Sequence, residues 1–132
     1  MQKPKTDKLS IEKRAFNYAV EIFSLVILIN KIPILWDLGR QVTRSGSSVA
    51  ANIAEAKYAA SRKDFAHFYR IALKSAHETR FWLELCVASI KKEMPNNAAT
   101  PSITSKCTTT IKEVVQIENI LWASIKTLES KL

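Results

Sequence analysis

The feature that most constrains the fold is a helix-length run in which almost every side chain is small. Residues 44–56 read RSGSSVAANIAEA. Gly46, Ala50 and Ala54 recur every four residues, so they form a narrow seam along one side of the predicted helix. Because Gly inside a helix costs about 1 kcal/mol relative to Ala, we expect a neighbouring backbone to approach this seam closely and offset that cost.

The rest of the chain also favours helices, since only two Gly and four Pro occur among 132 residues and sheets need more turn residues. Apolar side chains recur at three- and four-residue spacing in four long segments. We expect these four helices near residues 11–30, 35–58, 62–92 and 101–131. Helices of this length with short connections favour an all-α, up-down-up-down antiparallel four-helix bundle. Residues 9–132 are predicted to form this single domain, after a flexible basic tail of residues 1–8.

Local signals place several helix ends. Pro33 disfavours helical geometry in the residue before it and ends the first helix. Ser61 and Asp64 have the spacing of a capping box, in which a hydroxyl and a carboxylate bind free backbone N–H groups at the start of a helix. Thr100 is predicted as the N-cap of the fourth helix, with Pro101 at its first position.

The first predicted helix is more apolar than one helix of a bundle needs to be. Its core stripe includes Tyr18, Ile22 and Leu25. Phe16 and Phe23 belong to a second apolar stripe beside it. Such a helix has to be covered on more sides than its neighbours in the bundle offer. We therefore expect copies of the chain to associate.

Cysteine usage and hydropathy predict a cytoplasmic protein. Cys86 and Cys107 fall on apolar stripes at equal distances from the loop between the third and fourth helices. We expect two buried, reduced thiols at one level of that hairpin. Met1–Ser10 lacks the apolar core of a secretory signal. The longest apolar run, Leu25–Ile29, is far shorter than the roughly 20 residues that span a bilayer, so no membrane partner is expected.

A net charge of +8 creates a positive field suited to phosphate groups. A basic stripe lies about 200° around the third predicted helix from its core stripe, at roughly 100° per residue. The candidate nucleic-acid-binding residues are Lys63, His67, Arg70, Lys74 and His77, with Arg62 and Arg80 at the edges. Lys and Arg side chains would bind the phosphate backbone without reading its sequence, and the lysines of the tail would extend the stripe. A solvated surface accounts for the same stripe equally well.

Polar residues beside the seam form a second group. Asn52 and Glu55 share a face with Arg44 and Ser48, which favours a buried hydrogen-bonded network that fixes helix register. The predicted structural and oligomer motif consists of Arg44, Ser45, Gly46, Ser48, Ala50, Asn52, Ala54 and Glu55. Glu55 gives little support for catalysis, because no His or Asp lies within sequence reach of it.

One sequence pattern gives a weak indication of enzymatic activity. Arg62 with His67, and Arg70 with His77, fit the R-x(4–6)-H spacing of HEPN-type ribonucleases, in which an Arg–His pair at a dimer interface handles proton transfer and phosphate charge. That spacing has little specificity in an Arg-rich chain. The sequence has no phosphate-binding loop, nucleophile elbow or metal-binding motif. We therefore predict no enzymatic activity, no cofactor and no metal site, with a HEPN-like ribonuclease as a remote alternative.

Several segments resemble the small four-helix-bundle proteins encoded in intervening sequences of bacterial 23S rRNA genes, also called the S23 ribosomal protein family. These segments are residues 41–56, 61–65 and 71–85, and residues 14–16 are similar as well. They cover most of the first three predicted helices in the right order. The fourth helix resembles the family only in its apolar pattern.

The resemblance implies a bundle that assembles into a homopentameric ring with a basic surface. Relatives include accessory proteins of diversity-generating retroelements, which resemble pentamers that bind nucleic acid and a reverse transcriptase. No enzymatic activity is established for the family. We therefore expect a non-enzymatic homo-oligomer that binds RNA or another nucleic acid. The alternative is a protein-interaction scaffold, or an accessory subunit to an enzyme such as a reverse transcriptase, with no direct role in nucleic-acid binding.

Overall fold

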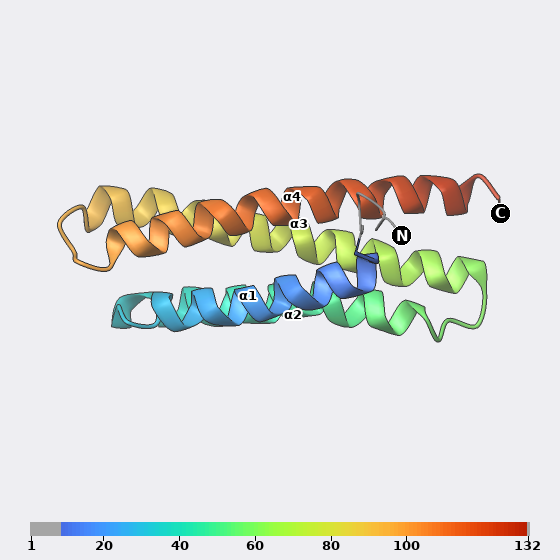
Figure 1. Cartoon of the computed structure of the whole chain (residues 1–132), viewed down its shortest axis with the longest axis horizontal. Coiled ribbons are helices and arrows are strands. Elements are labelled where there is room, and N and C mark those ends of the chain that lie inside the picture. Colours follow the sequence, from blue (N-terminus) through green and yellow to red (C-terminus); the bar gives the residue numbers. More distant parts are fainter. Residues whose placement is uncertain (1–8, 132) are drawn as a thin grey trace, which may run out of the picture.

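The computed structural model describes residues 9–131, which form four α-helices and no strand. The helices are α1 (Ile11–Ile29), α2 (Trp36–Ala56), α3 (Arg62–Glu93) and α4 (Thr100–Glu129), with a short 3-10 helix η1 (Pro33–Leu35) before α2. The chain reverses direction at each connection, so the helices run alternately up and down (Figure 1). The predicted all-α antiparallel four-helix bundle is confirmed. The predicted basic tail of residues 1–8 lies outside the described residues.

Each helix packs against two others around one core. α1 contacts α2 and α4, and α3 contacts the same two helices, so α1 and α3 lie diagonally across the bundle. In Figure 1 α1 and α2 form the lower layer, and α3 and α4 form the upper one. The largest fully buried side chains come from all four helices. They include Tyr18, Ile22, Leu25, Ile29, Ile53, Leu83, Ile90, Ile103, Ile117 and Leu121.

The start of α3 is capped as its sequence predicts, whereas the start of α4 is not. Ser61 Oγ accepts a hydrogen bond from the Asp64 N–H at 3.0 Å, and the Asp64 carboxylate accepts one from the Ala60 N–H at 3.0 Å. The prediction of Thr100 as N-cap is wrong, because Thr100 is already the first helical residue. Its hydroxyl instead donates to the Met94 carbonyl at 2.7 Å, which satisfies an acceptor at the end of α3.

The predicted small-residue seam is real where α2 meets α1, but a side chain rather than a backbone fills it. A Cβ atom on Gly46 would lie 3.0 Å from both Cγ1 and Cγ2 of Ile22. Gly46 is buried, Ala50 is half-buried and Ala54 is exposed. The seam therefore runs from the α1 contact out to the surface of α2.

The two cysteines lie together in the core between α3 and α4. Cys86 and Cys107 are both free thiols and both buried. The neighbouring Cys86 thiol and burial raise the pKa of the Cys107 thiol. The prediction that both thiols are buried at one level of this hairpin is confirmed.

Candidate nucleic-acid interface

The outer side of α3 carries the basic residues that the sequence singles out. We call Lys63, His67, Arg70, Lys74 and His77 the basic strip. All five side chains are exposed, as is Arg62, whereas Arg80 is half-buried. Because α3 lies diagonally opposite α1, the basic strip points away from the side of the bundle on which α1 lies.

Carboxylates of α4 neutralise part of this positive charge. Arg70 forms an ion pair with Glu129. Arg80 Nε donates to the Glu118 carboxylate at 2.8 Å, and Glu118 is itself only 8% exposed. This hydrogen bond raises the pKa of Arg80. The bond joins the charged Arg80 side chain to α4 and therefore stabilises the α3–α4 contact. His77 Nε2 lies 3.8 Å from the same Glu118 carboxylate.

Other basic residues of this side form no salt bridge with the described residues. Among the residues from 9 to 131, Lys63, Lys74 and Lys126 form no salt bridge. Lys126 comes from α4 and was not among the residues that the sequence indicated. Its ammonium lies 5.4 Å from the centre of the Trp122 ring. No periodicity within α3 could have indicated Lys126, because the two helices come together only in the folded hairpin.

A shallow hollow joins the two helices beside the basic strip. Its lining consists of Arg70, Leu73, Lys74 and His77 from α3 and Trp122, Ile125 and Glu129 from α4. Trp122 is 56% exposed, so its ring lies largely in the open.

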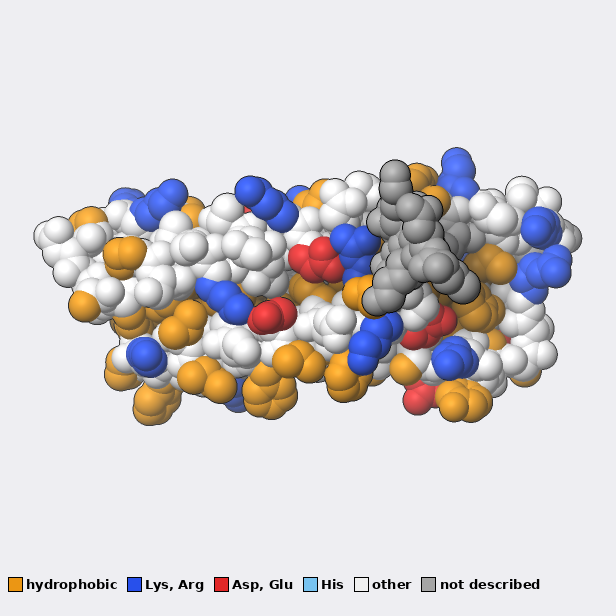
Figure 2. Space-filling view, viewed as in Figure 1, with side chains coloured by type: hydrophobic (Ala, Val, Ile, Leu, Met, Phe, Trp, Pro, Cys, Tyr) orange, Lys and Arg blue, Asp and Glu red, His pale blue; other side chains and the backbone are white. Residues whose placement is uncertain are grey.

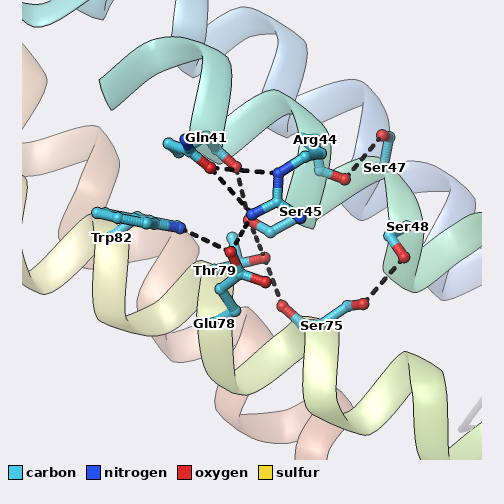
Figure 3. A network of polar contacts seen from close by, with 9 residues as sticks. All are labelled: Gln41, Arg44, Ser45, Ser47, Ser48, Ser75, Glu78, Thr79 and Trp82. Carbon is cyan, nitrogen blue, oxygen red and sulfur yellow. Dashed lines mark hydrogen bonds and ion pairs between the residues drawn. The ribbon is translucent and has the colours of Figure 1, made fainter. Parts of the chain in front are cut away.

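The polar residues of the predicted structural motif contact α3 through a hydroxyl network (Figure 3). Thr79 Oγ1 donates to Ser45 Oγ at 2.9 Å, and the Ser48 and Ser75 hydroxyls are 2.9 Å apart. Asn52 Nδ2 donates to the Ser48 carbonyl at 2.9 Å. The Asn52 bond lies within α2, whereas the two hydroxyl contacts join the helices and fix the register of α2 against α3.

The outer edge of this network is an ion pair between α2 and α3. Arg44 contacts the Glu78 carboxylate, which also accepts a hydrogen bond from Trp82 Nε1 at 3.1 Å. The prediction of Glu55 as a member of the buried network is wrong. Glu55 lies in the last turn of α2, beyond the hydroxyl pairs, and its side chain is exposed.

A row of large apolar side chains lies exposed along α1. We call Phe16, Val20, Phe23 and Ile27 the α1 row, and between 52% and 67% of each is exposed. Figure 2 shows hydrophobic side chains gathered along the lower edge of the molecule, where α1 lies. The expectation that α1 exceeds what one bundle can cover is confirmed.

The residues of the ribonuclease-like spacing all lie exposed on α3. Arg70 is bound to Glu129, and at 1.5 Å per residue it lies about 10 Å along α3 from His77. Arg62 and His67 are both exposed. Within residues 9–131, no cluster of three or more His, Cys, Asp or Glu side chains could hold a metal ion. None of the described helices is both long and apolar enough to cross a membrane.

Comparison with known proteins agrees with this architecture. Residues 7–116 match the family model of the 23S rRNA-intervening sequence protein. A solved protein of unknown function from the S23 ribosomal protein family of Bacteroides thetaiotaomicron VPI-5482 is 34% identical, with a TM-score of 0.58. The similarity covers 83% of this chain and 98% of that one. A comparison with curated proteins finds no significant match. Since the family model spans most of its length, this chain belongs to the 23S rRNA-intervening sequence protein family.

Proposed function

We propose that this protein is a non-enzymatic homo-oligomer of the cytoplasm that binds RNA, or another nucleic acid, through the outer side of α3. One observation carries the proposal, namely that the α1 row and the basic strip lie on diagonally opposite helices. Copies that associate through α1 keep their basic strips accessible. The protein then presents the same cationic surface several times.

The α1 row supports the homo-oligomer. A contiguous row of four large apolar side chains is unusual on the surface of a monomer. The exposed side of α2 next to α1 holds small residues such as Ala54 and Ser47, which leave room for large side chains from another copy. A closed ring of such contacts, with five copies as the family resemblance implies, would cover the row on every subunit.

The basic strip supports binding to phosphate. Lys63 and Lys74 are exposed and unpaired within the described residues. Cations of this kind contact the nucleic-acid backbone without reading sequence, and the affinity falls steeply as salt rises. One subunit alone offers few contacts. Repeating them around an oligomer raises the overall affinity without any new contact.

The test replaces Lys63 and Lys74 together by Glu. Both side chains are exposed, so the bundle should stay folded. Binding to a structured RNA, measured by fluorescence anisotropy at low salt, should weaken at least about tenfold, because two phosphate contacts become repulsions. The control replaces Lys31 and Lys57 by Glu, which changes the net charge equally at exposed positions outside α3 and α4. Equal losses in both variants would show that net charge, not the strip, determines binding.

The second candidate function is a scaffold or accessory subunit that binds another protein. It is favoured by the ion pairs of Arg70 and Arg80 with Glu129 and Glu118, which reduce the free positive charge of α3. This function predicts freshly purified protein with no retained nucleic acid, shown by its absorbance ratio at 260 and 280 nm. It also predicts no RNA binding at low salt by the wild type.

The ribonuclease alternative requires RNA cleavage. It predicts that His67→Ala or His77→Ala abolishes that cleavage. Wild-type protein that leaves RNA intact, both with and without divalent metal ions, would exclude it.

A further inference from the structure

The hollow between α3 and α4 combines an exposed aromatic ring with cations. Trp122 offers 56% of its surface to solvent. Lys126 lies 5.4 Å from the ring centre, and Lys74 lines the hollow from α3. Leu73 and Ile125 provide an apolar floor. An indole beside flexible ammonium groups is suited to hold a flat ring with a phosphate attached to it.

Trp122 also differs from the other two tryptophans in its bonding. The indole N–H of Trp36 donates to the Asn30 carbonyl at 2.8 Å. The indole N–H of Trp82 donates to the Glu78 carboxylate at 3.1 Å. The indole N–H of Trp122 has no partner in the part of the chain that the structure describes. It is therefore available to a ligand.

Some of the charges around the hollow are already paired. Glu129 lines the hollow but is engaged by Arg70, so this pair is close to neutral. His77 is held near the Glu118 carboxylate. Lys74 lines the hollow and the Lys126 ammonium lies over the Trp122 ring. Neither forms a salt bridge with the described residues, so both can bind an anion next to the ring.

We propose that this hollow is a stacking site for an unpaired nucleobase, which makes single-stranded RNA, or the loops and ends of a folded RNA, the ligand class. The base would stack on Trp122, and Lys126 and Lys74 would bind its phosphates. Bases within a duplex are stacked and paired with each other and cannot reach the ring. This inference rests on the proposed nucleic-acid binding and specifies which form of nucleic acid the protein prefers.

The experiment compares two RNA probes of about 12 nucleotides, within the site sizes of single-strand-binding proteins. One is oligoadenylate, and the other is a fully paired duplex of the same length. Trp122→Leu removes the stacking ring and stays apolar, whereas Trp122→Phe keeps a smaller ring. Trp36→Leu is the matched control, because Trp36 is also 56% exposed.

The expected result is tighter binding of oligoadenylate than of duplex by the wild type. Trp122→Leu should weaken oligoadenylate binding by about tenfold or more and leave duplex binding unchanged. Trp122→Phe should retain most of the affinity, and Trp36→Leu should bind like the wild type. All variants should keep the wild-type assembly mass in light scattering.

Three results would overturn the inference. Trp122→Leu could bind oligoadenylate as well as the wild type, or it could lose single-strand and duplex binding equally. It could also change the assembly mass, which would assign Trp122 to a subunit interface. A wild type that binds neither probe at low salt contradicts the proposed function as well. Equal binding of both probes by the wild type contradicts only the stacking site.

Discussion

Glu78 shows how one side chain joins several parts of the bundle. Its carboxylate accepts a hydrogen bond from Trp82 one turn further along α3 and contacts Arg44 on α2. The hydrogen bond from Trp82 lowers the pKa of Glu78 the most, and the contact with Arg44 lowers it further. A lowered pKa in the folded state means that the ionised form stabilises the fold.

Glu78→Gln should therefore destabilise the protein in a pH-dependent way. The stabilisation by ionised Glu78 is complete above the ordinary carboxyl pKa of 4.5 and is lost as the pH falls through the lower folded value. At neutral pH we expect the variant to lose about 0.5–1 kcal/mol, because the group is partly screened by solvent. Urea unfolding at pH 7, 5 and 3 measures this loss. A difference between wild type and variant that persists undiminished at pH 3 contradicts the assignment.

Gly46→Ala tests the α1–α2 contact at a single atom. Ala is the better helix former by about 1 kcal/mol, but its Cβ would press against buried Ile22 at 3.0 Å. Overpacking a core costs about 1–3 kcal/mol, so we expect a net loss of about 1 kcal/mol in unfolding free energy. Ser47→Ala is the control, because Ser47 is exposed on the same helix and the change should be neutral or slightly stabilising. A more stable Gly46→Ala protein would mean that the contact is loose.

At the scale of the helices, the sequence predicts the fold well. The ends of all four helices are predicted within two residues, because the apolar spacing persists over many turns. The buried positions of α3 recur at three- and four-residue spacing from Ala66 to Ile90, as a core stripe requires. Long periodic helices with few breakers leave little freedom in where they begin and end.

The sequence predicts only part of the candidate site, because the site depends on how α3 and α4 pack against each other. The exposure of the basic strip follows from the periodicity of α3. The neutralisation of positive charge on α3 does not follow from that periodicity. Glu129 is far from Arg70 in sequence, and Glu118 is far from Arg80, so each pair meets only through the α3–α4 contact. The same contact brings Trp122 beside Lys74, and Lys126 lies over the Trp122 ring. Pairings between helices depend on relative rotation and register, which the spacing within one helix does not encode.

The α1 row leads to a prediction about one helix. Replacing Phe16 and Phe23 by Ser should lower the mass of the assembly in light scattering. Both side chains are at least 60% exposed, so the folded chain loses little of its own core, and the helical circular dichroism spectrum should be retained. Tyr58→Ser is the control, because Tyr58 is 85% exposed and lies outside α1. An unchanged mass for the double variant would show that α1 is not the interface.

At the scale of the whole molecule, the proposed assembly would strengthen the proposed binding to RNA. α1 and α3 lie on opposite corners of the bundle, so association through one need not cover the other. In the proposed oligomer, several basic strips would contact one long RNA. The avidity of such an array can exceed the affinity of one strip by about 10²- to 10⁴-fold.

The Phe16→Ser, Phe23→Ser double variant should therefore also lose affinity for long RNA, although it changes no basic residue. The slope of log K against log salt should become shallower, because fewer phosphates are contacted at once. Anisotropy titrations at several salt concentrations measure both quantities. An oligonucleotide short enough to reach one subunit only should bind the variant and the wild type equally. Loss of affinity for that short probe would mean that the substitutions damage the site itself.

The buried cysteine pair has a practical consequence for such experiments. Cys86 and Cys107 are each 0% exposed, so thiol-directed dyes cannot reach them while the bundle stays folded. A cysteine introduced on the outside of the protein would then be the sole labelling point. Energy transfer between labelled copies could report how many subunits meet and at what spacing, with the natural thiols left in place.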